Sequence, residues 1–131
     1  MLTEKLTNSV YANLKKIDYK SFNGDKQSMS AKDNYRVVSL LEKEITILFT
    51  REVILDLAAG YTLSVEVEFK RFAKEGFNLG DILKEEIVDQ NIDELSAPIT
   101  NYMSLLVAQI TASFNRQPII TSPNYIGDKN K

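Results

Sequence analysis

The stretch that most constrains the fold is YTLSVEVEF, residues 61–69, in which apolar and polar side chains alternate without exception. The apolar set consists of Tyr61, Leu63, Val65, Val67 and Phe69, and the polar set of Thr62, Ser64, Glu66 and Glu68. Successive side chains of a strand point to opposite faces of its sheet, so the pattern predicts a strand with one buried and one solvated face. Such a strand is typical of an antiparallel sheet, because a parallel strand covered on both faces is apolar throughout.

Further strands are predicted upstream of this one. Residues 35–58 are rich in Val, Ile, Leu and Phe and alternate in two pieces, although no glycine or proline separates the pieces. A helix over 37–48 is also compatible with the local composition. The polar stretch 23–34 predicts a loop or a hairpin connection, and Gly60 predicts a tight reversal before the alternating strand. Residues 2–16 show a weak helical spacing of leucine and valine, but their second half is equally compatible with a strand.

A long amphipathic helix is predicted after the strands. Apolar residues recur at steps of three and four, in the order Leu95, Ile99, Tyr102, Met103, Leu106, Ile110 and Phe114. This spacing predicts a helix of about 20 residues, with Pro98 either in its first turn or at a kink. A shorter helix is predicted over 81–90. Strands followed by helix predict an α+β domain, with helical material packed on one face of an antiparallel sheet.

The composition removes most catalytic chemistry. The 131 residues include no cysteine and no histidine, which excludes disulfides, thiolate nucleophiles and the usual zinc and haem ligands. The net charge of −2 shows no basic field of the kind that nucleic-acid binders carry. We therefore predict a protein that is not an enzyme and needs no cofactor or metal. We expect it to be cytoplasmic, because the sequence contains neither a secretory signal pattern nor about 20 consecutive apolar residues.

Two features invite a functional interpretation. Glu66 and Glu68 share the polar face of one strand, where carboxylates about 7 Å apart could perform acid–base chemistry or bind a cation. A solvated strand face explains them equally well, and we prefer that interpretation. The segment QPIITSPNY, residues 117–125, places Ile119 and Ile120 between two prolines. These isoleucines either belong to the core or line a binding groove.

The order of these features resembles the SecB export-chaperone family. The resemblance is clearest over 99–125, where an apolar helix precedes an extended segment with two prolines. The residues that match are Tyr102, Ser104, Ile110, Thr111, Asn115, Pro118, Ile119, Ile120, Pro123, Asn124 and Tyr125. LSVEVEFKRF (63–72) is similar to the family's last strand, and LKKIDYKSF (14–22) to its first. The chain departs from the family by ending soon after Tyr125, where the family has a second helix.

The resemblance implies a four-stranded antiparallel sheet with one long helix. The length predicts a single domain over 1–131, and we expect disorder at 1–8 and 127–131. It implies an ATP-independent holdase that binds non-native proteins and delivers them to the export motor SecA, assembled as a dimer of dimers. The alternatives are a dedicated chaperone for one partner, such as an antitoxin, or an oligomeric adaptor with the same fold.

The resemblance also implies roles for particular residues. The apolar client groove is expected to contain Phe22, Phe69, Phe72, Ile119, Ile120 and Tyr125. The acidic face that contacts the motor is expected to contain Glu66 and Glu68. The oligomer interface is expected to contain Tyr102, Met103, Leu106 and Ile110.

Overall fold

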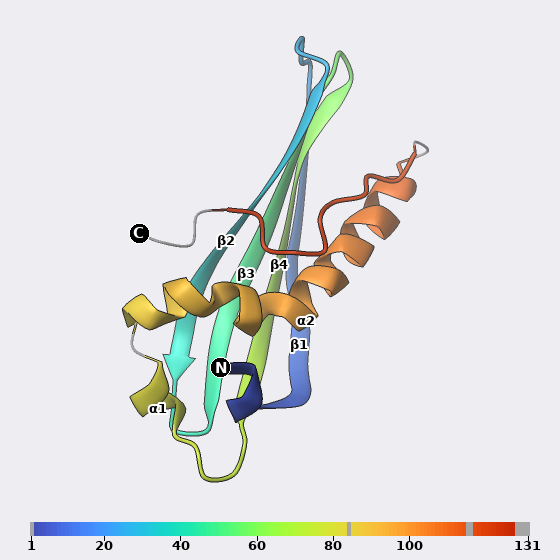
Figure 1. Cartoon of the computed structure of the whole chain (residues 1–131). Helices are drawn as coiled ribbons and strands as arrows, with labels where there is room; N and C mark the ends of the chain where they lie inside the picture. Colours follow the sequence, from blue (N-terminus) through green and yellow to red (C-terminus); the bar gives the residue numbers. More distant parts are fainter. Residues whose placement is uncertain (1, 84, 115–116, 128–131) are drawn as a thin grey trace.

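The computed structural model describes residues 2–83, 85–114 and 117–127. In chain order its elements are η1 (Leu2–Lys5), β1 (Leu6–Phe22), β2 (Ser28–Leu40), β3 (Glu44–Asp56), β4 (Gly60–Ala73), α1 (Leu79–Ile82) and α2 (Glu85–Ala112). Figure 1 shows one long twisted sheet with α2 lying across one of its faces. The predicted α+β class, with a four-stranded antiparallel sheet and one long helix, is confirmed. No helix in the described ranges is long and apolar enough to cross a membrane.

The strands lie in the order β1-β4-β3-β2, and every neighbouring pair is antiparallel. β1 and β2 are therefore the two edges of the sheet, although they follow one another in the chain. The connection between them passes the β3–β4 turn, where the Gly24 N–H donates to the Leu57 carbonyl at 2.6 Å. The Asp25 N–H donates to Asp56 Oδ1 at 3.0 Å in the same place. One main-chain bond and one bond to a side-chain carboxylate thus connect the two turns at this end of the sheet.

The alternation predicted for residues 61–69 is confirmed, and it divides the sheet into two faces. Leu63, Val65 and Val67 are fully buried on the face that α2 covers, which we call the helix face. The buried partners on β3 and α2 are Ile45, Ile47, Phe49, Val53, Val88, Ile92, Leu95, Ile99, Met103 and Val107. Thr62, Ser64 and the two glutamates of β4 are partly exposed on the opposite face, which we call the far face.

Several upstream predictions are wrong in detail. The helical spacing over 2–16 forms only the short η1, because residues from Leu6 onward pair with β4 as a strand. Disorder over 1–8 is not found for residues 2–8, since Leu2 and Leu6 are buried against the core. The alternative helix over 37–48 is replaced by β2 and β3, whose turn at 41–43 lacks glycine and proline. The connection predicted over 23–34 is short, because β2 begins at Ser28.

The long helix begins earlier than predicted and is bent. α1 and α2 divide the short helix expected over 81–90, and Pro98 lies inside α2. Figure 1 shows α2 changing direction midway along its length. Proline has no N–H, so the carbonyl of Glu94 loses its helical donor. The Nη1 atom of Arg71, on the helix face of β4, donates to this carbonyl at 3.0 Å and to the Leu95 carbonyl at 2.8 Å.

Gly60 marks the tight reversal that the sequence predicted between β3 and β4. A Cβ atom at this position would lie 2.1 Å from the Leu55 carbonyl oxygen, which belongs to the backbone. We expect Gly60→Ala to lower the free energy of unfolding by about 1–3 kcal/mol, because the turn must open to accept the methyl group. Urea denaturation measures this loss. Ala59→Ser, an exposed position in the same turn, is the control, and equal midpoints for the two variants would contradict the prediction.

Candidate functional site

A fully buried ion pair lies on the helix face between β2 and β3. The strand register places Asp33 directly opposite Arg51. Arg51 donates from Nε to Asp33 Oδ1 and from Nη2 to Asp33 Oδ2, each at 2.7 Å. Both side chains have no solvent exposure. A bidentate pair of this kind is among the stronger polar contacts in proteins, and it fixes the orientation of the guanidinium.

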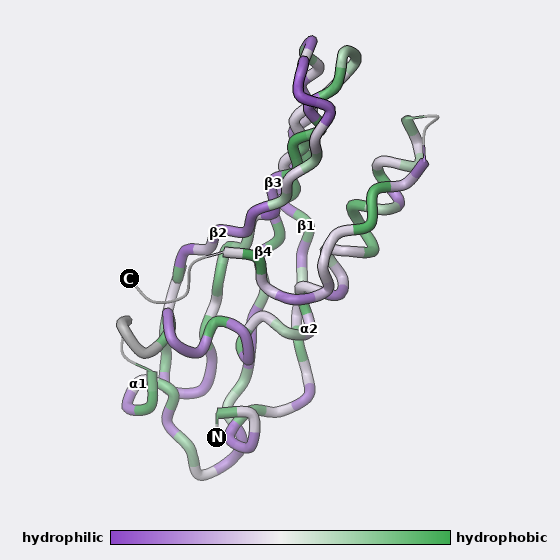
Figure 2. The backbone as a smooth tube through the Cα atoms, turned by 45° about the horizontal axis from the view of Figure 1, so that its top comes forward, coloured by the Kyte–Doolittle hydropathy of each residue, from purple (hydrophilic) through white to green (hydrophobic). Residues whose placement is uncertain are grey.

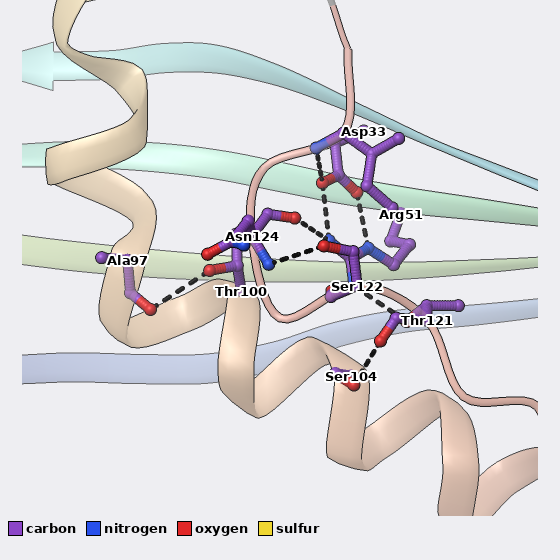
Figure 3. Close-up of polar contacts among 9 residues, drawn as sticks. Asp33, Arg51, Ala97, Thr100, Ser104, Thr121, Ser122 and Asn124 are labelled. Atoms are coloured by element: carbon purple, nitrogen blue, oxygen red, sulfur yellow. Dashed lines mark hydrogen bonds and ion pairs between the residues drawn. The ribbon is translucent and has the colours of Figure 1, made fainter.

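The same guanidinium holds the segment that follows α2. We call residues 117–127 the C-terminal strap. Arg51 Nη1 donates to the Ser122 carbonyl at 2.6 Å and to Thr121 Oγ1 at 2.9 Å, and Nη2 donates to the Asn124 carbonyl at 3.0 Å. Figure 3 shows the strap passing between α2 and this pair. Arg51 therefore recognises the strap mainly through its backbone.

Further main-chain bonds complete the attachment of the strap. The Ile126 N–H donates to Asp33 Oδ2 at 2.8 Å, and the Asp33 N–H donates to the Ile126 carbonyl at 2.7 Å. On the helix side, Ser104 Oγ donates to the Thr121 carbonyl at 2.8 Å. Thr111 Oγ1 accepts from the Ile119 N–H at 2.8 Å. The strap is thus attached to α2 at one end and to the outer edge of β2 at the other.

The two isoleucines of the strap have different surroundings. Ile119 is partly buried and packs against the core, whereas Ile120 is 70% exposed. Tyr125 is also partly buried, with its ring edge-on to Phe49 at 6.0 Å and to Tyr35 at 6.2 Å between centroids. Only Ile120 among these three offers a large apolar surface to a partner.

The six residues expected in one client groove do not share one surface. Phe69 is fully buried in the core. The register places Phe72 opposite Glu44, and Phe22 opposite Gly60, on the far face. The strap residues lie on the helix face. The two sets are separated by the thickness of the sheet.

The residues expected in an oligomer interface are also divided. Met103 is fully buried against the sheet, and Leu106 and Ile110 are partly buried beside the same core. Tyr102 is 37% exposed, and the neighbouring Leu105, which the sequence analysis did not select, is 57% exposed. The outward side of α2 therefore presents Tyr102 and Leu105.

Glu66 and Glu68 lie partly exposed on the far face, as the alternation predicted. Glu66 is opposite Lys16 on β1 and Thr50 on β3, while Glu68 is opposite Asn13 and Leu48. Within the described part of the chain, no group of three or more acidic side chains could hold a metal ion. Glu66 and Glu68 therefore have the surroundings of a solvated strand face.

The largest departure from expectation lies on β1. Leu14, Ile17 and Tyr19, which we call the β1 apolar strip, are 38%, 44% and 51% exposed. They are opposite the buried residues Val67, Val65 and Leu63, so the strip belongs to the helix face. The sequence predicted a strand here, but its pattern did not show that the strand would lie at an edge with its apolar side chains uncovered.

Aromatic residues bound this strip at one end. The ring of Phe114, just after α2, lies 4.9 Å from the ring of Tyr19 and 5.2 Å from that of Tyr61, measured between centroids. The rings of Tyr19 and Tyr61 are 5.4 Å apart. The end of α2 is therefore attached to the sheet through three rings, beside the exposed part of Tyr19.

The buried pair makes a direct prediction about stability. Arg51→Met leaves the Asp33 carboxylate buried without its cation, and we expect a loss of about 3–5 kcal/mol in the free energy of unfolding. Replacing both partners, as Asp33→Leu with Arg51→Met, should cost less than the single change, because no unpaired charge remains. Chemical denaturation measures both, with the exposed Arg36→Met as control. A double variant as unstable as Arg51→Met would count against this account.

Comparisons with known proteins bear on the whole arrangement. No protein-family model matches the sequence, and no curated protein matches it. A SecB-like chaperone of Mycobacterium tuberculosis, solved in complex with a ChAD peptide from an antitoxin, is similar in structure with a TM-score of 0.70. The two are 9% identical, and the similarity covers 92% of this chain and 88% of that one.

A second solved structure, a protein of unknown function from Streptococcus agalactiae, is similar with a TM-score of 0.50 and 11% identity. That similarity covers 87% of this chain and 97% of the other. Identities this low show a shared fold. The fold that the sequence predicted is confirmed by the first structure, and the chain has the fold of a SecB-like chaperone.

Proposed function

We propose that this protein is an ATP-independent chaperone that holds non-native proteins, and that the β1 apolar strip forms part of its binding surface. The observation that carries the proposal is the exposure of Leu14, Ile17 and Tyr19 along an edge strand. A row of large apolar side chains beside backbone that is paired on one side only is a template for an added strand. Soluble proteins that keep such surfaces uncovered commonly use them for binding.

The chemistry of a holdase fits this chain. Binding an extended segment requires main-chain hydrogen bonds and loosely specified apolar contacts, and it requires no catalytic side chain. Such a protein shifts its clients towards the unfolded state by mass action, because it binds that state and not the folded one. A sequence without histidine or cysteine is sufficient for this task.

A dedicated chaperone for one partner is the second candidate. The M. tuberculosis structure with the same fold holds a peptide from an antitoxin, which favours this alternative over an adaptor without clients. The two candidates differ in the range of client proteins that they bind. A general holdase suppresses the aggregation of several unrelated denatured proteins near stoichiometric ratio, whereas a dedicated one protects only a partner that purifies with it.

Assembly and delivery remain further parts of the proposal. We propose a homo-oligomer, a dimer of dimers as the family resemblance implies, with the exposed Tyr102 and Leu105 of α2 in its interfaces. We also propose that the far face, through Glu66 and Glu68, contacts the SecA motor. The separation of these glutamates from the helix face would let one molecule hold a client and contact the motor together.

The strip is tested by placing a charge in it. Ile17→Asp should weaken client holding by about tenfold or more, because burying an aliphatic side chain contributes about 1.5–3 kcal/mol and a carboxylate loses that term. Light scattering of a denatured client, titrated with the chaperone in the absence of ATP, measures the effect. Leu41→Asp, an exposed leucine in the β2–β3 turn, is the matched control. Full holding activity in a folded Ile17→Asp variant would exclude the strip.

The motor contact is tested on the far face. Glu66→Lys with Glu68→Lys should weaken binding to SecA by about tenfold at low salt, since reversing charges at an interface removes attraction and adds repulsion. Surface plasmon resonance measures this binding. Aggregation suppression should stay at the level of the unmodified protein. Parallel loss of both activities would instead indicate that the variant is misfolded.

A further inference from the structure

We propose that the C-terminal strap is the resident occupant of a peptide-binding site on the helix face, and that an extended segment of a partner protein replaces it there. This inference rests on the proposed chaperone function and names the chemistry of a segment that the protein holds. The site lies between α2 and β2, where Figure 1 shows the strap crossing the sheet.

The strap is recognised mainly through groups that any extended chain carries. Arg51 donates to the carbonyls of Ser122 and Asn124 at 2.6 and 3.0 Å. Ser104 of α2 donates to the Thr121 carbonyl at 2.8 Å. Main-chain hydrogen bonds of this kind give affinity for extended peptides of varied sequence. The site can therefore accept a backbone other than that of the strap.

At the edge of β2 the strap is bound in the manner of an added strand. The Ile126 N–H donates to the Asp33 carboxylate at 2.8 Å, and the Ile126 carbonyl accepts from the Asp33 N–H at 2.7 Å. A replacing segment must supply an N–H at this position, so proline is excluded from it.

Two side chains of the strap show which sequences the site prefers. Thr121 is buried, and its Oγ1 accepts from Arg51 Nη1 at 2.9 Å. Tyr125, four residues later, lies edge-on to Phe49 and Tyr35, and ring contacts of this geometry contribute beyond their buried area. The site therefore selects a segment with a hydroxyl residue followed, four positions later, by an aromatic residue.

The strap is packed loosely enough to exchange. Within residues 117–127 only Thr121 is buried, and Ile120 is 70% exposed. A cavity of about 360 Å³ lies between the second half of the strap and α2, and it is lined by Asp93, Ala97, Thr100, Asn124 and Tyr125. Segments with few buried apolar contacts open at a low free energy while the rest of a protein stays folded.

The buried ion pair favours replacement of the strap over its simple loss. An empty site leaves Arg51 without three of its acceptors and Asp33 without an N–H donor. Unsatisfied buried charges are costly, and a second extended segment removes this cost by supplying the same carbonyls, hydroxyl and N–H. The occupant is therefore a polypeptide and not a small ion, which offers no such row of groups.

The strap itself supplies the probe. A fluorescently labelled peptide QPIITSPNYIG, the sequence of residues 117–127, is titrated with the full-length protein and followed by anisotropy. The resident strap competes, so the apparent affinity is reduced to the fraction of the protein in which the site is open. Tyr125→Ala in the protein should raise this fraction, and we expect the peptide to bind about tenfold more tightly. The same change in the peptide should weaken binding about tenfold.

A second variant repeats this reversal without disturbing the rings. Ile126→Pro removes the N–H that Asp33 accepts, so it should strengthen peptide binding when it is in the protein and weaken it when it is in the peptide. Ile120→Ala is the matched control, because this exposed side chain of the same segment should change neither.

Recognition through the backbone is tested with a third peptide. QPIATAPAYIG keeps the threonine and the tyrosine and carries alanine in place of the exposed Ile120, Ser122 and Asn124. We expect it to bind within about threefold of the parent peptide, because the site contacts the carbonyls at these positions.

Three results would overturn the inference. The first is that Tyr125→Ala and Ile126→Pro bind the peptide no more tightly than the unmodified protein. The second is that the peptide without its tyrosine binds as tightly as the parent. The third is that the loosened variants form dimers that exclude the peptide, because the site then accepts the strap of a second copy.

Aggregation suppression measured in parallel separates this inference from the proposed function. If suppression persists while no peptide enters the site, only the inference about the strap fails. If the peptide exchanges with the strap but no denatured protein is protected, the chaperone function fails, and the site binds a segment of a partner that is not a client.

Discussion

The buried pair of Arg51 and Asp33 is the contact on which the rest of this structure depends. Removing two charges from water costs several kcal/mol for each ion, so such a pair persists only where further hydrogen bonds satisfy it. Here the guanidinium also binds two carbonyls and a hydroxyl of the strap, and the carboxylate also accepts an N–H from it. The strap therefore supplies hydrogen bonds that the buried pair needs, and the pair in turn holds the strap in place. One arrangement of β2, β3 and the strap satisfies all of these groups.

A second buried arginine, Arg71, contacts α2 at its bend. Arg71 donates to two carbonyls of α2, one of which lacks an N–H donor because of Pro98. Its Nε has no hydrogen-bond partner among the residues that the structure describes. Burial lowers the pKa of the Arg71 guanidinium, because desolvation disfavours the charged form. The bend in α2 thus combines a proline with a cation that hydrogen-bonds the carbonyls of Glu94 and Leu95, about one turn before Pro98. Figure 2 shows polar and apolar stretches on both sides of this bend.

Side-chain periodicity predicted the parts of the fold that depend on one element at a time. The alternation around Val65 and the helical spacing around Met103 each identified a strand or helix and its buried side, because burial follows the geometry of the element. Arg51 and Asp33 were missed, since they are 18 residues apart and meet only through the register of β2 and β3. The exposed strip was missed for a related reason. A strand pattern shows which side chains share a face, but the order of strands in the sheet decides which strand lies at its edge.

The strand order leaves the two edge strands, β1 and β2, in different surroundings. β2 is covered at Asp33 by the strap, in the manner of proteins that protect their edges with a loop. β1 keeps Leu14, Ile17 and Tyr19 exposed within a strand of 17 residues, which also carries lysines and an irregular register between Leu14 and Lys16. A long apolar edge is a hazard for a protein that works alone, because it templates aggregation. In a protein that binds other chains before they aggregate, the same edge can serve as the binding surface. The protection of one edge and the exposure of the other agree with the strand-binding function proposed above.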